Sequence, residues 1–292
     1  MPMLKEVYSY LQSKSKTFPW VEATVIKEHF INRIGIGNRN LVTDASLYNI
    51  TLETCVQGEK ARGTISNFDR VHKLQRYQFL EILVRFSIFL YCNTSLRSGM
   101  ASGKNADEER NEYNELNPAQ AFYIFLENKV KPYYQSLTIS GQSFRDDQLW
   151  VHDIDMVYTI NELAIRELFR KYQRPGQDTL TEPDFDRMLI EDAKIPGVTH
   201  AMVREAFGMS QMTVVQESDD KAFATYSHSK FAENLEVLAR ISVFLFEGSE
   251  MESEDLKLKL EHLLNELFKT INKKVKFNRI IIEEFSDSDD DY

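Results

Sequence analysis

Few residues in this chain have the types and spacing that catalysis or nucleotide binding requires. Residues 99–104 contain the glycines and the lysine of a phosphate-binding loop, but three residues separate the glycines where four are needed. Asn105 also replaces the Ser or Thr that would reach a magnesium ion. The six histidines are scattered, without metal-ligand spacing and outside any known catalytic motif. We therefore expect no catalytic residue, no cofactor and no enzyme activity.

Residues 173–184 come closest to a metal site, because they have the outline of a calcium-binding EF-hand loop. These twelve residues lie between two predicted helices, and apolar Leu180 stands at position eight, where such loops pair with a sister loop. Thr181 and Asp184 suit a capping box at the start of the second helix. Calcium needs oxygen ligands at positions one, three, five and twelve, which here are Gln173, Pro175, Gln177 and Asp184. Proline offers no side-chain oxygen, and a short Asp replaces the usual bidentate Glu, so we expect no metal to bind.

A second loop of this kind is expected in the first half of the chain. Laying residues 29–33 on residues 168–172 without gaps places Leu41 on Leu180. The ligand positions of that loop then become Ile34, Ile36, Asn38 and Ala45, with no carboxylate among them. Both loops keep the spacing of an EF-hand and lack its charge, which favours a protein that works independently of calcium.

Two helical segments share a sequence, which indicates an internal duplication. Residues 80–91 align with residues 235–246, and seven of the twelve positions are identical. The identities include a Glu and an Arg four residues later, which are Glu81 and Arg85 in the first copy and Glu236 and Arg240 in the second. That spacing favours a pair on one helix face. We expect these to be local surface pairs, with a partner-facing role as the alternative.

The spacing of apolar residues predicts helices throughout the chain, which only 11 glycines and 7 prolines interrupt. We therefore expect an all-α fold of two tandem EF-hand-like units. After the shared segment each copy continues with an amphipathic helix, capped by Asn117 in the first copy and by Ser253 in the second. The expected organisation is a first unit over residues 1–136, a linker over 137–148, a second unit over 149–271, and a basic strip with a disordered acidic tail over 272–292.

Charge is distributed unevenly along the chain. The net charge is −10, and six acidic residues lie in the last ten positions, where Ser286 and Ser288 suit acid-directed kinases. Just upstream is a basic strip made of Lys269, Lys273, Lys274, Lys276 and Arg279. A strip this short does not form the broad cationic face that nucleic acid requires, so we expect no nucleic acid to bind.

Hydropathy and cysteine content favour the interior of a cell. The most apolar stretch, residues 86–92, is far shorter than the roughly 20 residues of a membrane span. The first residues carry charge at once, which does not suit a secretion signal. Cys55 and Cys92 have neither metal nor redox spacing. We expect a protein of the reducing cytoplasm, without membrane contact.

A pair of short motifs in the second copy resembles a known group of proteins. Ser210, Met212, Val214 and Val215 precede the segment from Leu235 to Ile241. This order is similar to EF-hand-like proteins of cilia and flagella, whose second motif opens with a Phe. The first copy has that residue, Phe79, whereas the second has Asn234. The resemblance spans about residues 20–270 and implies a scaffold or linker of the axoneme or of another microtubule-associated part of the cytoskeleton.

Together these observations favour a non-catalytic structural or adaptor protein that holds partner helices in grooves between its own helices. Because tubulin is acidic, the basic strip is the segment that we expect to contact it. Two alternatives stay open. One is a calcium-responsive sensor with an irregular site near Asp219 and Asp220, and the other is a regulatory subunit of a phosphatase or kinase.

Overall fold

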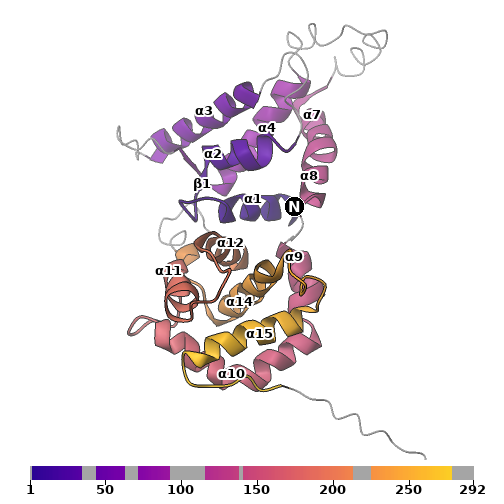
Figure 1. Ribbon diagram of the computed structural model, residues 1–292. Helices are drawn as coiled ribbons and strands as arrows, with labels where there is room; N and C mark the ends of the chain where they lie inside the picture. The colour runs from indigo at the N-terminus through magenta and orange to yellow at the C-terminus, as the bar shows by residue number, and fades with distance from the viewer. Residues whose placement is uncertain are drawn as a thin grey trace, which may run out of the picture.

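Helices make up most of the protein, and the predicted all-α class is confirmed. The computed structural model describes residues 2–34, 44–62, 72–92, 116–137, 141–212 and 225–277. Within these ranges the only strands are two of two residues each, which form one small antiparallel sheet. The first half of the chain forms one lobe and the second half another, with helices α1 and α12 lying where the lobes meet (Figure 1).

The first lobe has a core rich in aromatic rings. Its elements are α1 (Pro2–Ser13), β1 (Val21–Glu22), α2 (Ala23–Val25), η1 (Ile26–Ile31), α3 (Asp44–Arg62), β2 (Lys73–Leu74), α4 (Arg76–Tyr91), α7 (Pro118–Phe125), η2 (Leu126–Val130) and α8 (Lys131–Gln135). The buried ring of Phe30 lies 5.8 Å from Phe79 and 5.1 Å from Tyr133. These contacts join η1, α4 and α8, so residues far apart in the sequence form one core.

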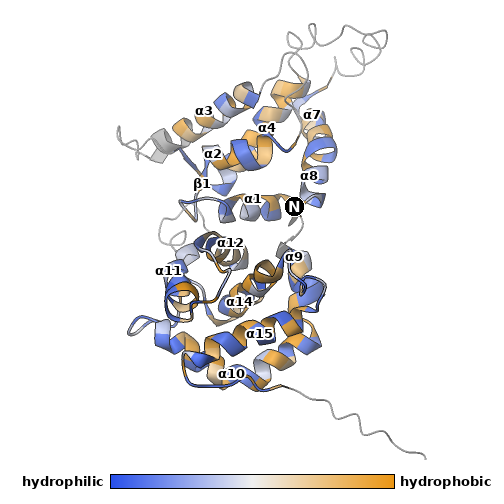
Figure 2. Cartoon of the chain, in the orientation of Figure 1, coloured by the Kyte–Doolittle hydropathy of each residue, from blue (hydrophilic) through white to orange (hydrophobic). Residues whose placement is uncertain are grey.

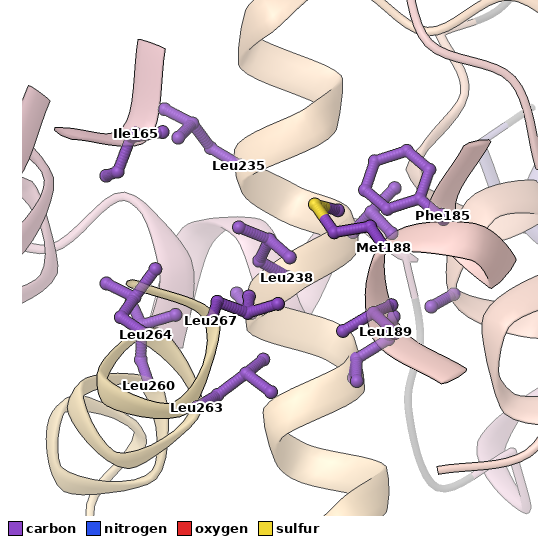
Figure 3. Close-up of a cluster of buried hydrophobic side chains, with 14 of the residues drawn as sticks. Ile165, Phe185, Met188, Leu189, Leu235, Leu238, Leu260, Leu263, Leu264 and Leu267 are labelled. Atoms are coloured by element: carbon purple, nitrogen blue, oxygen red, sulfur yellow. The ribbon is translucent and has the colours of Figure 1, made fainter. Parts of the chain in front are cut away.

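The second lobe has a separate core of aliphatic and aromatic side chains. Its elements are α9 (Gly141–Phe144), η3 (Arg145–Leu149), α10 (His152–Tyr172), α11 (Glu182–Asp186), η4 (Arg187–Asp192), α12 (His200–Ser210), η5 (Thr225–Ser227), α14 (Phe231–Phe246) and α15 (Leu256–Lys269). Leucines of α15 and the side chains of η4 surround α14 (Figure 3). Much of α14 is hydrophobic (Figure 2), as a helix inside a lobe must be.

In both lobes a short antiparallel contact joins two segments that each lie just before a helix. In the first lobe Val21 pairs with Leu74. In the second lobe Leu180 and Ser229 exchange both backbone hydrogen bonds, at 3.0 and 2.8 Å. Leu74 and Ser229 each stand two residues before the first residue of the duplicated helices, α4 and α14. The duplication therefore extends beyond the helices to the contacts between loops.

This arrangement corrects the position of the first loop. Val21, rather than Leu41, is the counterpart of Leu180, because each forms the loop contact two residues before a helix begins. Residues 29–33 lie at the end of the helix after that contact, whereas residues 168–172 end the helix before it. Similar apolar spacing on both sides of a loop made the wrong alignment fit. Of the ligand positions assigned there, Ile34 is buried and Ala45 lies in α3, while Ile36 and Asn38 lie outside the described residues, as does Leu41.

The expected caps and boundaries have mixed outcomes. Asn117 caps α7 as predicted, accepting a hydrogen bond from the backbone of Gln120 at 2.9 Å. For α15 the cap position is Asp255, so the prediction of Ser253 is wrong. The segment expected as a linker contains α9 and most of η3, and Phe144 within it is buried in the second core. At the other boundary, buried Val275 belongs to the same core.

The two lobes touch through α1 and α12, which pass each other closely at Gly208. A Cβ atom added to Gly208 would lie 2.9 Å from the Cα of Ser13 and 3.2 Å from the ring of Phe18. Phe18 packs edge-on against Phe207 at 5.8 Å, and Lys14 forms an ion pair with Glu205. Glycine is therefore the residue that lets the two backbones approach. Among the described helices, none is both long and apolar enough to cross a membrane.

Candidate protein-interaction surfaces

The carboxylate of Asp184 is committed to the start of α11. It accepts hydrogen bonds from the backbone nitrogen of Thr181 at 2.9 Å and from the hydroxyl of Thr181 at 2.7 Å. This is the capping box that the sequence predicts, and it is confirmed. Its other oxygen lies 3.5 Å from the guanidinium of Arg187. Asp184 therefore stabilises a helix end, and a calcium ion at this position would have to displace those contacts.

The other three positions of this loop face solvent wholly or in part. Pro175 and Gln177 are exposed and Gln173 is half-buried, while Gly176 between them turns the chain with φ of +79°. Across the described residues, no three His, Cys, Asp or Glu side chains come together in a group that could hold a metal. Asp219 and Asp220, the irregular site considered above, lie outside the described residues. In the structure this loop forms a turn between α10 and α11.

The basic strip lies against α10. The side-chain amide of Asn161 in α10 donates to the backbone oxygen of Lys276 at 3.1 Å, and the backbone nitrogen of Lys276 donates to Asn161 at 2.8 Å. Two of the five cations are near acids, because Lys269 lies 2.6 Å from Glu266 and Lys273 lies 3.3 Å from Glu167. The side chains of Lys274 and Lys276 are exposed, and Arg279 lies outside the described residues.

The two repeated Glu–Arg pairs have opposite environments. Glu81 and Arg85 on α4 form the expected surface pair at 2.6 Å, with side chains 43% and 33% exposed. Glu236 and Arg240 on α14 are 2.8 Å apart and almost wholly buried, so the prediction of a surface pair is wrong there. The first pair is a weak interaction screened by water, whereas the second is a buried ionic contact.

A third charged residue completes the buried contact on α14. Arg145 of η3 donates to the second carboxylate oxygen of Glu236 at 2.8 Å. The ring of Phe144 lies 4.3 Å from the guanidinium carbon of Arg240, in cation–π geometry. Burial lowers the pKa of Arg240, and the neighbouring carboxylate of Glu236 opposes that shift. The segment α9–η3 thus places one aromatic and one basic side chain on the Glu–Arg pair.

One face of α4 is apolar and exposed. The side chains of Tyr77, Leu80, Val84 and Ile88 are between 37% and 47% exposed, and they recur at spacings of three and four residues. Glu81 and Arg85 lie beside them on the same face. These apolar residues were not predicted to form an exposed face. The signal that could have found them is that α4 is apolar on more than one side, which marks a helix covered from several directions.

A cleft of about 400 Å³ lies between the lobes. Its lining includes Lys14 and Arg33 from the first lobe and Glu205 and Glu247 from the second. Lys14 and Glu205 pair with each other, and burial together with nearby Lys14 and Arg33 lowers the pKa of His29 behind them. The cleft therefore lies at the contact between the lobes, and the positive and negative side chains that line it balance each other.

Comparisons with protein families, with curated proteins and with solved structures found no match to this chain.

Proposed function

We propose that the protein is a non-catalytic structural or adaptor protein whose EF-hand-like helix pairs bind partner proteins. The observation that carries this proposal is the exposed apolar face of α4, since a contiguous row of apolar side chains on a helix suits a protein contact. The EF-hand-like description is supported by the short antiparallel contact between helix–loop–helix elements in each lobe. Helices paired in this way leave surfaces on which a partner helix can lie.

The loop chemistry supports binding over calcium sensing. A sensor loop must offer several oxygen ligands that are free to move onto the ion. Here position three is Pro175, and the carboxylate at position twelve, Asp184, is held by Thr181. A loop of this kind connects two helices and does not change their angle in response to a metal.

The partners would belong to a microtubule-associated assembly, such as the axoneme of a cilium or flagellum. Two features support this part of the proposal: the resemblance to ciliary EF-hand-like proteins, and the basic strip, whose Lys274 and Lys276 are exposed beside α10. Positive side chains on an ordered segment attract the acidic surface of tubulin.

Replacing all five cations of the strip with Ala should weaken co-sedimentation with stabilised microtubules by about tenfold in the apparent Kd, and added salt should weaken the wild-type protein in the same way. The substitutions are K269A, K273A, K274A, K276A and R279A. Sedimentation at several protein concentrations gives the Kd.

A matched control removes the same charge from other exposed cations. These are Lys16, Lys27, Lys131, Arg170 and Arg174, again changed to Ala. The control variant should pellet with nearly the wild-type Kd. If both variants lose binding equally, the effect is one of net charge and the strip is not the contact. If neither loses it, the basic strip is removed from the proposal.

A further inference from the structure

The duplicated helices α4 and α14 have nearly the same residues on one face, but the two copies differ in which segments cover that face. Leu235, Glu236 and Ala239 on α14 are buried, whereas their counterparts Leu80, Glu81 and Val84 on α4 are exposed. The side chains themselves are nearly the same, so the difference comes from the neighbours. The second lobe therefore displays how this face is covered when it is occupied.

In the second lobe part of the cover comes from residues 141–160, which comprise α9, η3 and the first part of α10. Within this segment Arg145 binds Glu236 at 2.8 Å, and the Phe144 ring stacks on Arg240 at 4.3 Å. Further along, the hydroxyl of Tyr158 donates to the backbone oxygen of Leu235 at 2.8 Å. The segment thus contacts the Glu–Arg pair through an aromatic residue that is followed directly by an arginine.

The face of α4 offers the same chemistry to an incoming helix. Glu81 supplies a carboxylate that is 43% exposed, and Arg85 supplies a guanidinium beside it. Leu80, Val84 and Ile88 supply the apolar surface that a helix would cover. The described helices with the most extensive contacts to α4 are α3, α7 and α1, and beside them Leu80, Val84 and Ile88 stay more than a third exposed.

We propose that this face of α4 binds a helical segment of a partner protein that presents an aromatic residue followed by an arginine, seated as α9–η3 is seated on α14. This inference rests on the proposed adaptor function and specifies the chemistry of its partner. Arginine is the fitting cation, because its planar guanidinium meets a carboxylate with two donors and its neighbour's ring can stack on Arg85.

A second copy of this chain is a poorer occupant than another protein. The segment with the fitting chemistry, α9–η3, is already used in its own lobe, where Phe144 is buried and Arg145 is only 18% exposed. Donating it to another molecule would expose that core and leave Glu236 without Arg145. A partner that brings its own segment avoids this cost.

The test uses a fluorescein-labelled synthetic peptide of residues 141–160 as the probe and the full chain as the receptor, with fluorescence anisotropy as the readout. We expect saturable binding that weakens about tenfold for the L80D or E81K receptor and changes little for L163D, a control on α10 at an 82% exposed position. A peptide carrying F144A should bind the wild-type receptor about tenfold more weakly, which probes the contact without altering the protein.

Charge exchange separates the α4 face from other binding modes. A peptide with R145E should bind wild type poorly and regain affinity for the E81K receptor. The inference is overturned if no saturable binding occurs up to about 1 mM peptide, or if E81K leaves the peptide affinity unchanged. It is also overturned if the chain forms a dimer through the α4 face, which sedimentation would show as a dimer that E81K dissociates. If the peptide does not bind but the chain still pellets with microtubules, the proposed function stands without this inference. If the peptide binds but the chain does not pellet with microtubules, this inference stands and the microtubule part of the proposed function fails.

Discussion

Replacing Glu236 with Gln should lower the free energy of unfolding by about 3–5 kcal/mol. Glu236 is the one carboxylate between two guanidinium groups, with Arg145 at 2.8 Å and Arg240 at 2.8 Å. Gln keeps the shape of the side chain and removes its charge, so Arg240, whose side chain is fully buried, would lose its compensating anion. Urea denaturation followed by circular dichroism measures the change.

The internal repeat supplies a matched control for this prediction. Glu81 makes the equivalent contact with Arg85 at 2.6 Å, but both side chains remain partly in water. Glu81→Gln should therefore change the free energy of unfolding by no more than about 0.5 kcal/mol. Equal effects of the two substitutions would contradict the burial that separates α14 from α4.

Replacing Gly208 with Leu should destabilise the contact between the lobes by at least about 2 kcal/mol. Even the first added carbon would lie 2.9 Å from the Cα of Ser13, which is backbone and cannot turn aside as a side chain can. The better helix propensity of Leu offsets about 1 kcal/mol of the cost and does not reverse it. The urea midpoint of the variant gives the net effect.

The control for this substitution lies on the same helix. Ala201 of α12 is exposed, so Ala201→Leu adds a large side chain at a position that faces solvent. It should leave the midpoint within about 0.5 kcal/mol of wild type. A Gly208→Leu protein as stable as Ala201→Leu would show that α1 and α12 do not depend on this close approach.

Local features of this fold were predictable because they depend on neighbours in the sequence. The helical class, the Asn117 cap and the box between Thr181 and Asp184 follow from residue types at fixed short spacings. The loop contact was harder to find. Its partner in the second lobe is Ser229, a polar residue that the rule of an apolar eighth position does not select.

The different burial of α4 and α14 could not be predicted from those helices themselves. They are nearly identical in sequence, and a residue's exposure depends on which other segment lies on it. The cover on the Glu–Arg pair of α14 includes side chains of α9 and η3, which lie mostly in the segment expected to be a linker. Small residues such as Ser140, Gly141 and Ser143 gave that segment the composition of a joint, although Phe144 anchors it in the core.

The central claim is that the protein binds its partners without the help of calcium. Calorimetric titration of the full chain with calcium chloride tests this claim most directly. We expect only heats of dilution up to about 1 mM calcium. A saturable signal in the micromolar range, lost in an Asp184→Ala variant, would contradict the claim. Such a result would mean that Asp184 leaves Thr181 for the ion and that residues 173–184 form a working calcium loop.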